Sequence, residues 1–157
     1  MRIGQGFDAH RFTQGSGFVL GGVAIPHDRS IEAHSDGDVL LHAICDALFG
    51  AAGLGDIGKH FSDQQDENKN RNSREFILQT LEMLKANDLF VSNIDGTVIL
   101  QKPKINIYTE QMRGIIASDL DIGVNQVNIK ATTTEKMGFI GREEGIAALA
   151  VVLLDSI

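Results

Sequence analysis

An alternation of apolar and polar positions marks the first predicted strand. In an extended chain over residues 1–10, Phe7 and Ala9 fall on one face, and Asp8 and His10 fall together on the other. A carboxylate and an imidazole are therefore expected side by side at the end of this strand.

A helix is predicted over residues 38–52 by an apolar stripe. The stripe has the spacing of one buried helix face and consists of Leu40, Ile44, Ala47, Leu48 and Ala51. Ser35 and Asp38 fit a capping box at its start. His42 and Asp46 each lie about 200° around the helix from Ile44, so they are expected on the opposite face.

The rest of the chain predicts further strands and helices. A bent strand or hairpin is expected over residues 18–26, where two glycines are adjacent, and a polar loop over 62–72. Helices are expected at about 72–87 and 108–120, and strands at 97–101, 127–131 and 146–154. The last segment is continuously apolar, so its periodicity alone does not exclude a helix.

Strands that alternate with helices predict an α+β fold of two layers. We expect a mixed four-stranded sheet with the helices packed on one face. The length of 157 residues suits a single domain over 1–157.

Composition and charge exclude some classes of function. The formal net charge is −7, aromatic residues make up 6%, and tryptophan is absent, so a nucleic-acid-binding surface is not expected. An anionic small molecule would have to be bound by a local site. The chain shows no signal or transit segment, its longest apolar run is too short for a membrane span, and its one cysteine, Cys45, cannot form an internal disulfide. A cytoplasmic location is expected.

Asp8, His10 and His42 are candidate metal ligands. Residues two apart on a strand project from the same face, so Asp8 and His10 can share one ion. Alone, such a pair is usually an ordinary surface pair, and His42 with its neighbours can equally be an exposed histidine beside a capped helix. Together, the three residues supply two nitrogens and one oxygen and leave a fourth position open, as in a catalytic zinc site.

Two further segments offer groups that suit phosphates. His34 and Ser35 lie just before the predicted helix over 38–52, where free backbone N–H groups favour anions. Residues 132–142 follow a predicted strand and offer hydroxyls, the carboxylate of Glu135 and the guanidinium of Arg142. A run of threonines also simply fits a strand, and the segments 55–58 and 102–104 are more often ordinary turns.

The chain resembles the 2-C-methyl-D-erythritol 2,4-cyclodiphosphate synthase family of the non-mevalonate isoprenoid pathway along nearly its whole length. The resemblance rests on four segments in the family's order and spacing: GQGFDAH (4–10), AHSDGDVLLHAICDALFGAAGLGDIGKHF (33–61), QKPK (101–104) and KATTTEKMGFIGREEGIA (130–147).

The resemblance implies a metal-dependent reaction. Asp8, His10 and His42 match the family's zinc ligands, and Glu135 matches the ligand of a second divalent ion, Mg²⁺ or Mn²⁺. The implied substrate is 4-diphosphocytidyl-2-C-methyl-D-erythritol 2-phosphate, whose 2-phosphate attacks the β-phosphorus so that CMP leaves and the cyclic diphosphate forms. The family is a homotrimer of three packed sheets with active sites at the subunit interfaces.

The resemblance also implies substrate contacts. His34 with Thr133 matches the pair credited with transition-state stabilisation. The matched positions are His34 and Ser35 at the phosphates, Asp56, Ile57 and Gly58 at the sugar hydroxyls, Phe61 and Asp63 in a mobile loop, Lys104, Ala131, Thr132 and Thr133 at the cytidine, and Phe139 and Arg142 as later contacts. The chain departs from the family pattern at Gln5, at Ser62 and around residues 102–106, so the nucleotide contacts are matched less closely than the metal ligands.

Two other functions fit the same residues. A zinc hydrolase or deaminase would hold water in the open position and use Glu135 or Asp56 as the base. A trimeric sensor would bind an isoprenoid diphosphate in a central cavity lined by Arg142 and Glu144, without releasing CMP.

Overall fold

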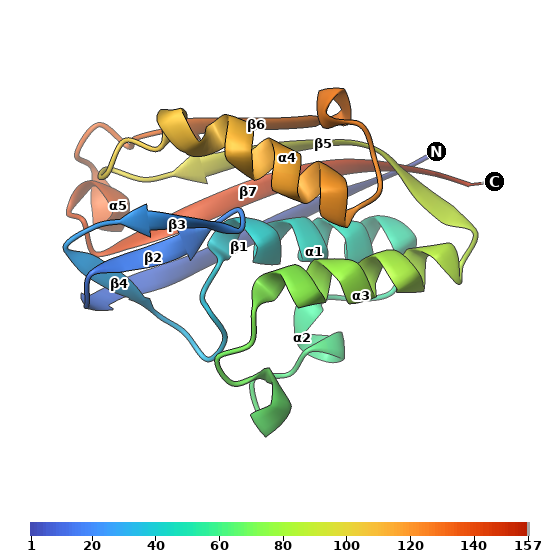
Figure 1. Ribbon diagram of the computed structural model, residues 1–157, viewed down its shortest axis with the longest axis horizontal. Coiled ribbons are helices and arrows are strands. Elements are labelled where there is room, and N and C mark those ends of the chain that lie inside the picture. Colours follow the sequence, from blue (N-terminus) through green and yellow to red (C-terminus); the bar gives the residue numbers. More distant parts are fainter. Residues whose placement is uncertain (157) are drawn as a thin grey trace.

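A five-stranded sheet forms one layer of the protein, and helices form the other (Figure 1). The computed structural model describes residues 1–156. The main sheet has the order β4-β1-β7-β5-β6, and only β5 and β6 pair in parallel. Its strands are β1 (Arg2–Gln14), β4 (Arg29–Glu32), β5 (Leu89–Ile99), β6 (Val127–Thr132) and β7 (Gly145–Ser156). The sheet is mixed, as predicted.

The prediction of four strands is wrong because β4 was missed. This strand contains only one apolar residue, Ile31, and so has no alternation to reveal it. It forms by pairing with the far end of β1, where Phe12 lies opposite Ile31. The predicted hairpin over residues 18–26 is confirmed, and β2 (Gly17–Leu20) and β3 (Val23–Pro26) form a separate two-stranded sheet.

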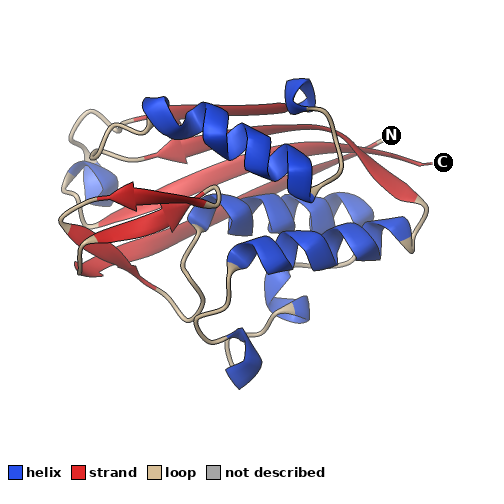
Figure 2. Ribbon diagram, viewed as in Figure 1, coloured by secondary structure: helices blue, strands red, loops and turns tan. Residues whose placement is uncertain are grey.

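The three long helices lie on the same face of the main sheet (Figure 2), as expected. The helices are α1 (Val39–Ala52), α2 (Ile57–His60), α3 (Ser73–Lys85), α4 (Thr109–Asp119) and α5 (Gly138–Gly141), with 3-10 turns η1 (Asp66–Asn68), η2 (Asn106–Tyr108) and η3 (Val124–Gln126). No helix within residues 1–156 is both long enough and apolar enough to cross a membrane.

Helix α1 lies between β1 and the other helices and is buried on almost every side. Its only residues that are not fully buried are His42, Asp46 and Gly50, which form one stripe at intervals of four residues. On the strand side, Gly4 and Gly6 of β1 touch the α1 backbone so closely that neither position has room for a Cβ. The strand and the helix are therefore held in a fixed register.

The start of α1 differs from the predicted capping box. Asp38 itself is the N-cap, and its Oδ1 accepts the backbone N–H of Leu41 at 3.1 Å. The same carboxylate accepts the N–H groups of Gly21 and Gly22 in the β2–β3 turn, at 2.9 and 2.8 Å. Ser35 instead accepts the N–H of Gly37 through its hydroxyl oxygen.

The strand β5 is much longer than the predicted segment at 97–101. Its pairing with β7 shifts register between Val91 and Asn93, and this irregularity interrupts the alternation that would have revealed the first half of the strand. The apolar segment 146–154 forms most of β7, a strand in the centre of the sheet, which settles the choice between strand and helix.

We predict that Asp38→Ala lowers the free energy of unfolding by about 3 kcal/mol, because it removes a helix cap and leaves the N–H groups of the hairpin turn without an acceptor. Urea denaturation followed by circular dichroism measures the loss. Asn72→Ala is the matched control: Asn72 is the N-cap of α3, it is exposed, and its side chain accepts only the N–H of Arg74. Its loss should cost about 1 kcal/mol. Equal losses in the two variants would contradict the bridging role of Asp38.

Candidate functional site

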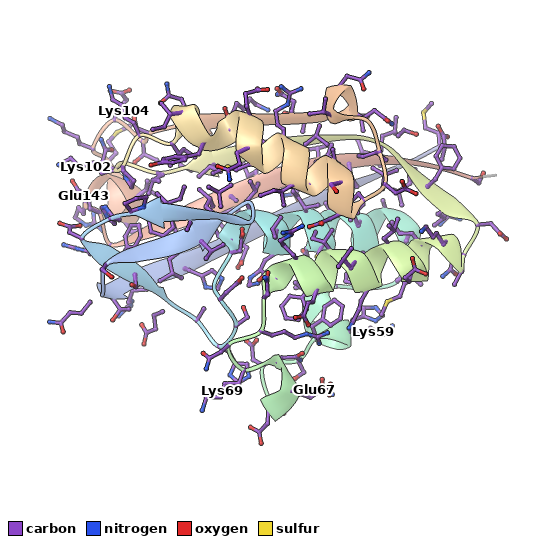
Figure 3. All side chains as sticks on the ribbon, in the orientation of Figure 1. Lys59, Glu67, Lys69, Lys102, Lys104 and Glu143 are labelled. Atoms are coloured by element: carbon purple, nitrogen blue, oxygen red, sulfur yellow. The ribbon has the colours of Figure 1, made fainter. Side chains whose placement is uncertain are left out.

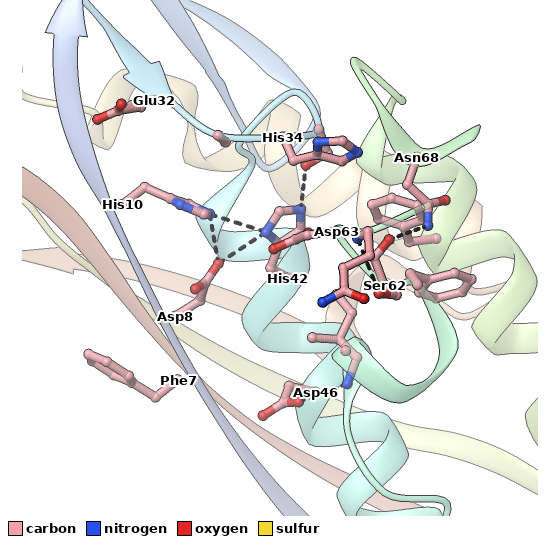
Figure 4. Close-up of a pocket in the computed structure, with 17 residues that line it drawn as sticks. Phe7, Asp8, His10, Glu32, His34, His42, Asp46, Ser62, Asp63 and Asn68 are labelled. Atoms are coloured by element: carbon pink, nitrogen blue, oxygen red, sulfur yellow. Dashed lines mark hydrogen bonds and ion pairs between the residues drawn. The ribbon is translucent and has the colours of Figure 1, made fainter. Parts of the chain in front are cut away.

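Asp8, His10 and His42 converge on one point, as Figure 4 shows. Asp8 Oδ2 lies 3.0 Å from His10 Nε2 and 3.0 Å from His42 Nδ1, and the two ring nitrogens are 3.3 Å apart. The expectation that the strand and the helix bring these side chains together is confirmed. Within residues 1–156 they are the one group of three or more such side chains close enough to share a metal ion.

The local structure explains why the three side chains meet. Gly4 and Gly6 let β1 pack directly against the backbone of α1. Asp8 and His10 follow them on the same face of the strand. His42 lies on the half-exposed stripe of α1, one turn after the N-cap Asp38. All three side chains are only partly exposed, with 27%, 20% and 11% of their surface accessible for Asp8, His10 and His42.

The electrostatics of the group favour a positive charge at its centre. Burial alone raises the pKa of Asp8, but hydrogen bonds from His10 and His42 outweigh it and lower this pKa from 3.8 to about 2. Burial lowers the pKa of His42, and the hydrogen bond and charge of Asp8 reverse this to give a net rise. Asp8 is therefore ionised at neutral pH, and a proton and a metal ion compete for the same place.

The donor set fits a tetrahedral divalent ion. With metal–ligand distances near 2.05 Å, ligand atoms of a tetrahedral site lie about 3.3 Å apart. The separations of 3.0, 3.0 and 3.3 Å in this group are close to that value without any rearrangement. Two imidazoles and one carboxylate leave the fourth position for a ligand from the pocket.

The three side chains line a pocket of about 610 Å³, within the usual range for small-molecule sites. The sequence-predicted residues that line it are Asp8, His10, His34, Ser35, His42, Ile57, Gly58, Phe61 and Asp63. Asp56 is not among the lining residues: it is the N-cap of α2, and its Oδ1 accepts the N–H of Lys59 at 2.9 Å. The start of α1 is capped by Asp38, and the side chains of His34 and Ser35 line the pocket just before it.

A second group of predicted residues lies outside this pocket. It comprises Lys104, Ala131, Thr132, Thr133, Glu135, Phe139 and Arg142, none of which lines the pocket. Most of these residues follow the ends of the parallel strands β5 and β6. In Figure 3, Lys104 lies at one end of the molecule, far from Lys59 and Lys69 near the pocket segments.

The second group has its own local order. Thr133 Oγ1 accepts the N–H of Glu135 at 3.2 Å, and the N–H of Lys136 donates to Gln101 Oε1 at 3.1 Å. Glu135 and Lys136 have φ values of 53° and 64°, a left-handed conformation that side chains other than glycine rarely adopt. Such strain in a polar loop is typical of a binding segment.

The pocket also includes residues that the sequence did not assign to it. Asp46 lies one turn after His42 on the same face of α1, and its Oδ1 accepts the N–H of Ile57 at 3.1 Å. Phe76 of α3 stacks on Phe61 with ring centroids 4.6 Å apart. The helical period already placed Asp46 beside His42, whereas nothing in the sequence pattern placed Phe76 there.

Together the fold and the site define a two-layer α+β protein whose small-molecule pocket carries a group able to hold a metal ion. The YgbB family profile matches residues 1–155, and the chain belongs to that family. The resemblance seen in the sequence is thus confirmed.

Named relatives agree with this assignment. The chain is 55% identical over 154 residues to the 2-C-methyl-D-erythritol 2,4-cyclodiphosphate synthase of Stutzerimonas stutzeri (strain A1501), covering 98% of both chains. The bifunctional IspDF structure from Campylobacter jejuni matches with a TM-score of 0.95 and 44% identity over 99% of this chain, which spans 42% of that longer one. A CDP complex of IspF from Plasmodium falciparum matches with a TM-score of 0.87 and 34% identity, covering 99% of this chain and 96% of the other.

We predict that the purified protein binds one zinc ion per chain and that His42→Ala loses this binding while the fold survives. The affinity should fall as the pH is lowered, because the raised pKa of His42 lets a proton compete with the ion. Competition with a chromophoric chelator measures the affinity, and circular dichroism checks the fold. His27→Ala, in the turn between β3 and β4, is the control and should bind zinc normally. Full zinc affinity in His42→Ala would remove His42 from the ligand set.

Proposed function

We propose that this protein is a metal-dependent 2-C-methyl-D-erythritol 2,4-cyclodiphosphate synthase. It converts 4-diphosphocytidyl-2-C-methyl-D-erythritol 2-phosphate into the cyclic diphosphate and CMP, as a phosphorus–oxygen lyase of isoprenoid biosynthesis. The observation that carries the proposal is the Asp8, His10 and His42 group in a 610 Å³ pocket, within a chain that is 55% identical to a named synthase along its length.

The reaction needs positioning and charge neutralisation more than a protein nucleophile, since the attacking phosphate belongs to the substrate. Cys45, the one thiol, is buried, and burial raises its pKa to about 12, so it does not compete as a nucleophile. In the proposed site, Asp8, His10 and His42 hold zinc, and Glu135 holds Mg²⁺ or Mn²⁺ with the diphosphate. Bound divalent ions polarise phosphate oxygens and offset their charge.

The side chains around the metal centre fix the substrate. His34 and Ser35 contact the phosphates from the segment before α1, and His34 acts with Thr133 to stabilise the transition state. Ile57 and Gly58, at the start of α2, bind the methylerythritol hydroxyls together with Asp56. Phe61 and Asp63 cover the substrate. Holding two phosphates in line in this way is worth roughly 7–11 kcal/mol in favourable cases.

The proposed active enzyme is a homotrimer in which a neighbouring subunit completes each pocket. The residues proposed to bind cytidine, Lys104 and 131–133, with Phe139 and Arg142 beside them, do not line their own chain's pocket. The sheet face opposite the helices exposes a row of apolar side chains, formed by Ile3, Phe7, Leu149 and Val151. A contiguous apolar face of this kind marks an interaction surface, and the packing of three such sheets would cover it.

The proposed enzyme acts as one domain over residues 1–157 in the cytoplasm, where a reducing environment suits a free thiol such as Cys45. The alternatives are a zinc hydrolase and an isoprenoid-diphosphate sensor. Arg142 pairs with Glu144 at 3.2 Å, so these two side chains are available together for the central cavity that a sensor requires.

We predict that the zinc-loaded protein, with Mg²⁺, releases CMP and the cyclic diphosphate in equal amounts from the cytidine substrate. In ¹⁸O-labelled water the product should contain no solvent oxygen, because the nucleophile is the substrate's own phosphate. Mass spectrometry of the product, with and without chelator, makes the measurement. Incorporation of ¹⁸O would favour the hydrolase, and binding of an isoprenoid diphosphate without CMP release would favour the sensor.

We predict a trimer in solution that Val151→Glu breaks, because a charge in the apolar sheet face opposes its burial. Light scattering after size-exclusion chromatography should give three times the mass of one chain for the unaltered protein and a lower mass for the variant, with loss of CMP release. Leu78→Glu is the control, since Leu78 is as exposed as Val151, at 46% against 41%, but lies on α3. A trimer that survives Val151→Glu, or an unaltered protein that is monomeric, would contradict this assembly.

A further inference from the structure

The ring of His42 is held at both of its nitrogens. Its Nδ1 faces Asp8 and His10, at 3.0 and 3.3 Å, and belongs to the proposed metal centre. Its Nε2 points the opposite way and lies 2.8 Å from the hydroxyl of Ser73, the first residue of α3. Ser73 is completely buried. The sequence pattern assigns Ser73 no role in the reaction.

Ser73 is in turn hydrogen-bonded to the carboxylate of Asp36. Its hydroxyl makes a short hydrogen bond to Asp36 Oδ1, and its backbone N–H donates to Asp36 Oδ2 at 3.0 Å. Asp36 is itself fixed, because its side chain accepts the N–H of Asp38 at 3.1 Å and its own N–H donates to the carbonyl of Arg71 at 3.1 Å. Asp36 and Ser73 thus connect the segment before α1 to the start of α3.

The direction of these hydrogen bonds determines which nitrogen of His42 carries a proton. A carboxylate only accepts hydrogen bonds, so the single hydroxyl proton of Ser73 is donated to Asp36. The Ser73 oxygen can then only accept from His42, and Nε2 must carry the proton. In the metal-free protein Nδ1 can carry a second proton, which it donates to Asp8. Once that proton leaves, the single N–H of the neutral imidazole is at Nε2, and the lone pair of Nδ1 points toward Asp8 and His10.

We propose that Ser73 and Asp36 are positioning residues that select the tautomer and orientation in which His42 binds the metal through Nδ1. The inference rests on the metal centre of the proposed function and adds two residues outside its ligand set. A carboxylate that acts through a hydroxyl on the ligand imidazole orients the ring and increases its basicity, as directly bonded carboxylates do at other metal sites.

Ser35 does not replace Ser73 in this role. Its hydroxyl oxygen is farther from His42 Nε2, at 3.2 Å, and also accepts the N–H of Gly37 at 3.3 Å. Ser35 also lines the pocket, whereas Ser73 is not among the lining residues. Ser35 therefore faces the pocket, whereas Ser73 supports the metal ligand His42.

The first test compares zinc affinities by chelator competition. Ser73→Ala should bind zinc about 10- to 100-fold more weakly than the unaltered protein, the usual effect of losing such a partner. Thr80→Ala is the matched control: Thr80 is an equally buried hydroxyl on the same helix, but it donates to the carbonyl of Phe76 and lies near Cys45. Thr80→Ala should bind zinc as the unaltered protein does.

The second test needs no variant. In the zinc-loaded protein labelled with ¹⁵N-histidine, nuclear magnetic resonance should show the His42 proton on Nε2, protected from exchange with water, and the metal on Nδ1. The opposite arrangement would overturn the inference even if Ser73→Ala failed to fold.

The outcomes separate this inference from the proposed function. If the unaltered protein bound no zinc, the metal centre and the inference would both fail. If it bound zinc and a folded Ser73→Ala bound it equally well, or if Thr80→Ala lost as much affinity as Ser73→Ala, only the positioning role would fail.

Discussion

The close contact between β1 and α1 is the constraint on which the rest of the structure depends. Gly4 and Gly6 bring the strand against the helix backbone with no space for side chains. A strand kept further from the helix by larger side chains would move Asp8 and His10 away from His42, out of a shared coordination sphere. The two glycines have no chemistry of their own, yet they set the distances of the site.

The contact is effective because α1 cannot move independently. The helix is covered by the sheet on one side and by α3 on another, and Asp38 joins its start to the β2–β3 turn. Only the stripe through His42 and Asp46 reaches the pocket. A metal centre on such rigid elements keeps its geometry when substrate and product exchange, which suits a reaction that depends on alignment.

The sequence predicted the parts of the site that follow from periodicity. The period of two placed Asp8 with His10, and the helical period placed His42 and Asp46 opposite the apolar stripe. The distance between these faces was not predictable from either period, because it depends on the packing of β1 on α1, and the resemblance to a known family supplied it instead. β4 and the first half of β5 were missed because a single apolar residue and a register shift leave no regular alternation. Ser73 was missed because its role arises from a contact between residues 37 positions apart in the chain.

An acidic chain that binds a substrate rich in phosphate raises an electrostatic question that the structure answers locally. The net charge of −7 acts weakly at the pocket, since exposed charges more than about 8–10 Å away are largely screened at physiological salt. The potential at the metal-binding group is set mainly by charges within a few ångströms, and Asp8 is the one carboxylate of that group. A divalent ion bound by one carboxylate and two neutral imidazoles leaves a net positive centre, whereas a second carboxylate in place of His42 would cancel it. The orientation of His42 is therefore as important as its position, and the hydrogen bonds that link Nε2 to Ser73 and Ser73 to Asp36 hold the ring with Nδ1 toward the ion.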